Sequence, residues 1–204
     1  MFAIVESGSI TSFPKGNKGI KIGDYNYPPA VFTLWSESER NAIGVYTVEI
    51  NETNKKDEAW YINTNITYAF GSGKVTGTYG TATAKPINDV KWTQSEIDSG
   101  EAPTGVDTNT IKTIGRKTVL IEDVKVRANN ILSKTDWYVV RKAEESTAIP
   151  SAITTHRQAV RSKQASMETA ITNAADTPAL ETLYTYTEQE DKSITRPLGE
   201  LPTL

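Results

Sequence analysis

Hydrophobic residues recur at helical spacing in two neighbouring segments of the second half of the chain. In the first segment they lie four, three and one residues apart, at Val124, Ala128, Ile131 and Leu132. In the second they lie seven residues apart, at Ile153, Val160 and Met167. Each spacing places the apolar side chains on one face of a helix, so the pattern predicts two helices that pack together as a hairpin.

The two segments meet at Thr135, Asp136 and Trp137, where a possible cap, a carboxylate and a large aromatic follow one another. One interpretation is structural: Asp136 caps the second helix or pairs with an arginine, while Trp137 fills the core of the hairpin and pins it. The other interpretation is functional: Trp137 and the arginines form a partner-binding site, because tryptophan and arginine dominate the energetics of protein interfaces. The arginines concerned are Arg141, Arg157 and Arg161.

The N-terminal part of the chain, residues 1–90, carries short runs of β-branched and aromatic residues separated by turn residues. Residues 2–5 and 10–13 flank a polar turn, which predicts a hairpin. Four later runs predict an antiparallel meander: residues 45–50, 59–64, 66–70 and 74–79. The expected product is an antiparallel, β-rich domain.

Helix ends are marked at two places. Ser36 and Glu39 have the spacing of a capping box, and Gly44 ends the short helix that they begin. Further on, Asp176 precedes Pro178, which is the order of an N-cap followed by a proline in the first helical turn.

The remaining segments complete an α+β organisation. Residues 91–115 have the composition of a loop, so we expect a polar linker in which only Trp92 docks on this chain or on a partner. Residues 116–187 form a small helical bundle. Residues 188–204 form an extended arm that becomes ordered only against a partner or another copy, because leucines such as Leu198, which follows Arg196, are too sparse to build a core.

Composition narrows the function classes. The 204 residues include 22 basic and 25 acidic side chains, a net charge of −3, so neither a nucleic acid nor a membrane is an expected partner. Cysteine is absent and there is one histidine, which excludes disulfides and thiolate zinc sites and leaves no expectation of a metal or another cofactor. No signal peptide or membrane-spanning run is present, and we expect a soluble protein.

Two motifs that suggest enzymatic chemistry are incomplete. Gly71, Ser72, Gly73 and Lys74 resemble the end of a phosphate-binding loop, but a tyrosine occupies the position of the first glycine and a valine follows the lysine. The alternative prediction is a hairpin turn. His156 has no serine and carboxylate at a spacing that would make a triad, so a hydrogen-bonding role on a helix is expected. We therefore expect no enzyme.

The helical region resembles a known family, the phage tail assembly chaperone proteins. The matching residues, over roughly residues 120–175, are Arg127, Leu132, Thr135, Asp136, Trp137, Arg141, Ile149, Pro150, Arg157 and Arg161. The N-terminal part also resembles the strand-rich region of marine phage relatives, including LWSESERNAIG at residues 34–44. The resemblance implies a virus-encoded, non-enzymatic protein of the tail module.

Two functions follow as expectations from the resemblance and the composition. The first is a transient chaperone that binds a tail or fibre protein during assembly in the host cytoplasm. The second is a permanent structural virion component, such as a tail or fibre adaptor or a decorating subunit. The expected partners are other phage tail or fibre proteins, with further copies of this chain as an alternative. The candidate partner-binding residues are Trp137, Asp136, Arg141, Arg157, Arg161, Trp92, Arg196 and Leu198.

Overall fold

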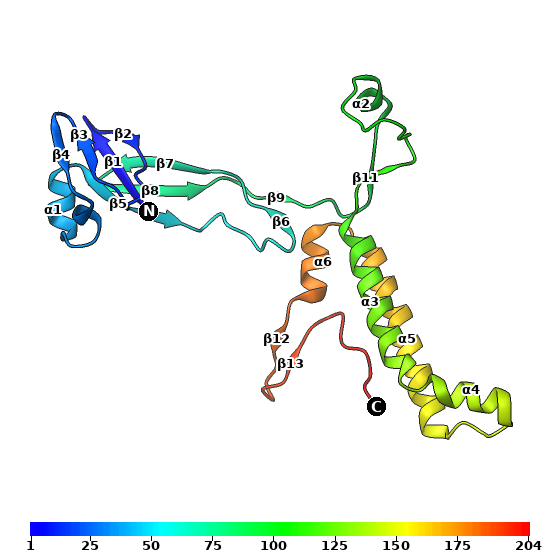
Figure 1. Cartoon of the computed structure of the whole chain (residues 1–204). Helices are drawn as coiled ribbons and strands as arrows, with labels where there is room; N and C mark the ends of the chain where they lie inside the picture. The colour runs from blue at the N-terminus through cyan, green and yellow to red at the C-terminus, as the bar shows by residue number, and fades with distance from the viewer. The chain divides into compact units, whose positions relative to one another are not determined.

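The computed structural model describes all 204 residues, which form two compact units, Met1–Thr83 and Ala84–Leu204. The first unit is rich in strands and the second contains the long helices (Figure 1). The α+β class predicted from the sequence is therefore confirmed.

The first unit is organised around a five-stranded sheet with the order β2-β1-β5-β8-β7. Its strands are β1 (Phe2–Glu6), β2 (Ser9–Ser12), β5 (Val45–Asn51), β7 (Ile66–Gly71) and β8 (Lys74–Tyr79). Phe13, which follows β2, packs on Tyr68 of β7 with ring centroids 4.6 Å apart, so the two edges of the sheet curl toward each other.

One strand pairing differs from the predicted antiparallel meander. Strands β5 and β8 are parallel, while the other pairs in this sheet are antiparallel. The β7–β8 hairpin places β8 on the inside because β8 carries Val75, which is fully buried, and Gly77, where a Cβ would lie 2.8 Å from the Tyr68 ring. Strand β6 (Tyr61–Ile62) lies outside this sheet.

Strand β1 is buried on both faces because its side chains alternate between two clusters. Ala3 and Val5 pack with Val48 and Val75 on one face. On the other face Ile4 packs with three buried residues: Val31, Phe32 and Val45. Elements that accompany this second cluster are β3 (Ile20–Ile22), β4 (Tyr25–Tyr27), the 3₁₀ helix η1 (Pro29–Phe32) and α1 (Glu37–Ala42).

Local signals read from the sequence are confirmed at several turns and caps. Ser36 and Glu39 form the predicted capping box of α1, and Asp176 accepts a hydrogen bond from the Ala179 N–H at 2.8 Å. The segment that resembled a phosphate-binding loop is the β7–β8 turn, in which Ser72 and Gly73 have positive φ angles of 51° and 72°. Two consecutive positive φ angles are typical of a two-residue hairpin turn.

The second unit begins before the predicted linker. Strand β9 (Thr83–Ala84) spans the junction, and the next residues cap the helical region. The Pro86 and Ile87 carbonyls accept hydrogen bonds from the first N–H groups of α3, which a helix start leaves without partners. Residues 91–115 are not a structureless linker, because they include most of the β10 (Val90–Lys91) and β11 (Ile111–Thr113) pair and α2 (Gln94–Asp98).

Two long helices, α3 (Arg116–Ser133) and α5 (Ser151–Asn173), lie side by side and form the predicted hairpin (Figure 1). Their shared interface is apolar: Leu120, Val124, Ala128, Ile153, Val160, Met167 and Ile171 are buried. In the sequence α4 (Asp136–Glu145) comes between these two helices, and it buries none of its residues. Helix α6 (Thr177–Tyr184) follows α5. None of the helices combines the length and the apolar character that a bilayer crossing requires.

The C-terminal segment packs on its own unit, so the prediction of an arm that orders only against a partner is wrong. After the β12 (Thr187–Glu188) and β13 (Ile194–Thr195) hairpin, Leu198 and Leu201 are 3% and 9% exposed. The Lys163 ammonium donates to the Leu198 carbonyl at 2.8 Å, and the Leu198 N–H donates to the Leu183 carbonyl at 3.0 Å. These leucines need no core within the C-terminal segment, because they pack against residues of α5 and α6.

A stack of aromatic and charged side chains fixes the start of this segment. The Arg196 guanidinium lies 5.0 Å from the ring centroids of both Tyr184 and Tyr186. Its Nε lies 2.7 Å from Glu200 Oε1, which also accepts a hydrogen bond from the Tyr186 hydroxyl at 2.6 Å. Arg196 and Leu198, predicted as partner-binding residues, thus make contacts within the chain.

We expect Leu198→Ala to lower the free energy of unfolding of the second unit by about 2–4 kcal/mol, because it leaves a cavity at a closed site. Leu204→Ala is the matched control in the same segment, since Leu204 is 78% exposed. Urea denaturation followed by circular dichroism measures both. Equal stability of the two variants would show that this segment does not pack on the helices in solution.

Acidification is expected to loosen the same segment through Glu200. Burial raises the pKa of Glu200, but the Tyr186 hydroxyl and the Arg196 and Arg127 guanidinium groups lower it by more, so the pKa lies below its ordinary value of 4.5. A carboxyl whose pKa is lowered by folding stabilises the fold above its unfolded pKa, and this contribution is lost as the pH falls through the folded pKa. Unfolding free energy measured from neutral pH to below pH 4.5 should fall less for Glu200→Gln than for the unmodified chain.

Candidate partner-binding site

The site is built on Arg157, a buried arginine in the second turn of α5. Its side chain is 9% exposed. One terminal nitrogen donates to the Leu132 carbonyl and to the Thr135 hydroxyl oxygen, both at 2.7 Å. The other donates to Asp136 Oδ1 at 2.8 Å. One guanidinium therefore joins the last turn of α3, the start of α4 and the second turn of α5.

These contacts explain why the chain turns where it does. The last carbonyls of a helix lack partners within the helix. The Leu132 carbonyl accepts hydrogen bonds from the Arg157 guanidinium and from the Thr135 N–H and hydroxyl. The Asp136 carboxylate lies in the first turn of α4, where the helix dipole favours negative charge. Pairing between Asp136 and an arginine was one of the alternatives in the sequence, and Arg157 is the partner.

Trp137 does not fill the core of the hairpin, so the structural interpretation is wrong for this residue. Its side chain is 51% exposed. The Trp137 and Tyr138 ring centroids lie 3.9 Å apart, and the Arg141 guanidinium lies 4.7 Å from the centroid of the Trp137 ring. Arg141 can reach both rings because residues three and four positions apart lie on the same side of a helix. The hairpin is pinned by Arg157 instead.

We call Trp137, Tyr138 and Arg141 the α4 platform. Figure 1 shows α4 extending from the end of the α3–α5 pair. A helix of this length is marginal by itself, and α4 buries no side chain, so the Asp136–Arg157 ion pair anchors it. The platform is thus an exposed tryptophan stacked with a partly buried tyrosine and a partly buried arginine, on a helix that is held at its first turn.

A hollow of about 270 Å³ lies beside the platform, between α4 and α5. It is lined by Val139, Ile149, Thr154, Arg157, Gln158 and Arg161. Arg161 is exposed and forms no ion pair, unlike Arg157. The hollow therefore combines apolar side chains with one free guanidinium, which can donate hydrogen bonds to a carboxylate of a bound molecule.

Trp92, the candidate in the predicted linker, belongs to a separate cluster. The Lys112 ammonium lies 4.6 Å from its ring centroid and pairs with Glu96. The hydrogen bond from Lys112, followed by those from Thr93, lowers the pKa of Glu96 to about 2. Trp92 thus docks on its own chain, through the short segment that contains α2, and lies apart in sequence from the α4 platform.

His156 has the hydrogen-bonding role that its position indicated. Its Nε2 lies 3.2 Å from the Pro202 carbonyl oxygen, so it contacts the C-terminal segment rather than a catalytic group. No group of three or more histidine, aspartate or glutamate side chains is arranged to hold a metal ion.

A second exposed apolar surface was missed in the sequence. Ile114, Val119 and Val126 are 58%, 42% and 48% exposed and line a hollow of about 420 Å³ along α3. Val119 and Val126 lie seven residues apart in α3. Val119 is next to the buried Leu120, and Val126 is two residues from the buried Val124. The seven-residue spacing of these valines is the sequence feature that indicates this surface. The prediction rested instead on the longer apolar pattern of Val124, Ala128, Ile131 and Leu132.

Comparisons with protein-family models, with curated proteins and with solved structures find no match.

We expect Arg157→Met to lower the free energy of unfolding of the helical unit by about 2–3 kcal/mol, because it removes three hydrogen bonds from a charged group while keeping the aliphatic volume. Asp136→Asn should cost less, about 1 kcal/mol or under, since Asp136 is half exposed. Arg161→Met is the matched control on the same helix and should leave stability within about 0.5 kcal/mol.

Thermal and urea unfolding monitored by circular dichroism measure the three variants. A loss of stability in Arg161→Met as large as in Arg157→Met would contradict the role given to the buried guanidinium.

Proposed function

We propose that this protein is a non-enzymatic bacteriophage tail-module protein that binds a tail or fibre protein during assembly, in the manner of a tail assembly chaperone. The observation that carries the proposal is the α4 platform: a tryptophan, a tyrosine and an arginine stacked on a helix that buries nothing. The phage origin rests on the resemblance of the helical region to the tail assembly chaperone proteins.

The composition of the platform supports a protein partner. Tryptophan, tyrosine and arginine are the residues most enriched at the energetic centres of protein interfaces. Stacking also restricts the side chains before binding, so less conformational entropy is lost when a partner covers them. The Arg141 Nε is covered and makes no hydrogen bond, which is consistent with an arginine held mainly by the two rings.

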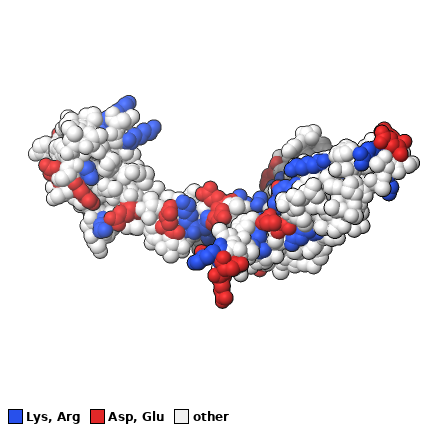
Figure 2. Space-filling view, turned by 90° about the horizontal axis from the view of Figure 1, so that it is seen from below, with Lys and Arg blue, Asp and Glu red and all other residues white.

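The charge distribution supports the same class of partner. Basic and acidic side chains are interspersed on the face shown in Figure 2, without a broad area of one sign. A nucleic acid requires a basic stripe or patch that tracks its phosphates, so a protein surface fits this distribution better. The free Arg161 beside apolar Val139 and Ile149 favours a partner segment that presents an acidic residue next to an apolar one.

A transient chaperone acts in the host cytoplasm and is absent from finished particles. Mass spectrometry of purified virions tests this part of the proposal. Absence of the protein supports the chaperone, whereas a fixed copy number per particle would make it a structural component of the tail.

We expect Trp137→Ala to remain folded and to lose its client. Truncation of an exposed side chain should change the free energy of unfolding by about 0.5 kcal/mol or less, whereas loss of an interface tryptophan typically costs about 2 kcal/mol of binding, or roughly thirtyfold in affinity. The measurement is the soluble yield of each tail and fibre protein of the phage when co-expressed with the variant, together with binding of any stabilised client by calorimetry.

The control is Tyr25→Ala, which removes a 72% exposed aromatic ring from the first unit. If Trp137→Ala and Tyr25→Ala keep equal client yield and affinity, the α4 platform is not the binding site.

A further inference from the structure

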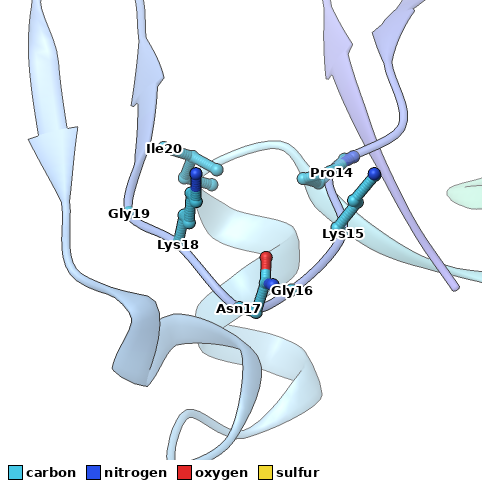
Figure 3. Close-up of a pocket in the computed structure, with 7 residues that line it drawn as sticks. All are labelled: Pro14, Lys15, Gly16, Asn17, Lys18, Gly19 and Ile20. Atoms are coloured by element: carbon cyan, nitrogen blue, oxygen red, sulfur yellow. The ribbon is translucent and has the colours of Figure 1, made fainter.

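The segment of residues 14–20, which comprises the loop before β3 and the first residue of β3, surrounds a hollow of about 450 Å³ in the first unit. All of the lining residues belong to this one segment, called the 14–20 loop below: Pro14, Lys15, Gly16, Asn17, Lys18, Gly19 and Ile20. Figure 3 shows the side chains of Lys15 and Lys18 extending to the same side of the loop, with the Asn17 amide between them. Two cationic groups and an amide therefore face one open space.

The two lysines of this segment have no ion-pair partner within the chain. Neither Lys15 nor Lys18 forms an ion pair, although other exposed lysines such as Lys74 and Lys192 do. The backbone N–H groups of residues 15–19 likewise donate no hydrogen bond to the rest of the chain. Successive free N–H groups in a turn make a concavity that binds anions, and nearby lysines add to its positive potential.

The loop is held in shape by the core beneath it. Gly16 has a φ of +77°, and a Cβ at this position would lie 3.7 Å from the rings of Phe2 and Phe32. At Gly19 a Cβ would lie 2.7 Å from the Tyr27 carbonyl oxygen, so only glycine allows this close approach. A loop fixed at two points loses little conformational entropy when a ligand binds.

We propose that the 14–20 loop binds a phosphate monoester. The Lys15 and Lys18 ammonium groups and the free backbone N–H groups bind the phosphate oxygens, and Pro14 and Ile20 contact the organic group. The hollow is larger than a bare oxyanion needs and falls in the range of small-molecule sites, which is why a monoester fits it better than inorganic phosphate. This site is independent of the α4 platform and of the function proposed for it.

Titration of the ¹⁵N-labelled full chain with phenyl phosphate, inorganic phosphate and phenol tests the proposal by amide chemical shifts. We expect phenyl phosphate to shift the amides of residues 15–19 and to bind more tightly than inorganic phosphate, with affinity that falls as salt is added. Phenol should cause no shift there. The double variant Lys15→Ala/Lys18→Ala should bind phenyl phosphate about tenfold or more weakly, because two charged contacts are lost.

Lys21→Ala is the matched control, since Lys21 follows the loop on β3 and does not line the hollow. Both variants alter exposed lysines, so they should fold like the unmodified chain. Equal weakening by Lys21→Ala, or unchanged binding in the double variant, would overturn the site. Inorganic phosphate that binds as tightly as phenyl phosphate would overturn the assignment of a monoester.

Discussion

The hydrogen bonds of Arg157 decide how the helical unit is arranged. A guanidinium that is 9% exposed has lost most of its water, and such a group is tolerated only when protein oxygens replace the solvent. Three oxygens do so here, and each belongs to a different part of the chain between α3 and α4: Leu132, Thr135 and Asp136. The end of one helix, the turn after it and the start of the next are therefore fixed by a single side chain of α5.

This arrangement has a consequence for α4. Because its first residue is held by Arg157, the helix does not need an apolar face to stay attached. Three of its apolar residues are left exposed: Trp137, Val139 and Val140 are 51%, 43% and 52% exposed. Exposed apolar groups that lie together can mark an interaction site, and under the function that we propose a partner covers this surface. In the same unit the C-terminal segment packs against α5 and α6, and the Arg196 guanidinium contacts the rings of Tyr184 and Tyr186.

The first unit follows a different constraint, the burial of one strand on both faces. Strand β1 separates two apolar clusters, and the loop of residues 14–20 rests on Phe2 and Phe32 at the edge of one of them. At Gly19 the Tyr27 carbonyl of β4 leaves no room for a side chain, and Lys15 and Lys18 are exposed. The cationic hollow is thus a by-product of core packing, and its chemistry differs from that of the α4 platform. The sequence feature that indicates this hollow is the alternation of lysine and glycine in residues 15–19. In a prediction of strands and turns the same residues indicate only a loop.

Features that depend on neighbouring residues could be predicted from the sequence alone. The capping box at Ser36, the cap at Asp176 and the β7–β8 turn are local, because a few side chains and φ angles decide them. The buried faces of α3 and α5 were also predicted, since helical spacing shows which side chains can share one face. The sequence also indicated that Asp136 could pair with an arginine such as Arg157, although it left open whether Trp137 fills the core of the hairpin or binds a partner. Three features depended on contacts between distant segments and were decided by the tertiary structure. The parallel β5–β8 pair arose because β8 carries the residues that tolerate an inner position. Trp137 is exposed because Arg157 takes the place in the hairpin that the aromatic ring was expected to fill. The C-terminal leucines are buried because α5 and α6 supply the surface that the segment lacks, and no spacing within residues 188–204 could show that surface.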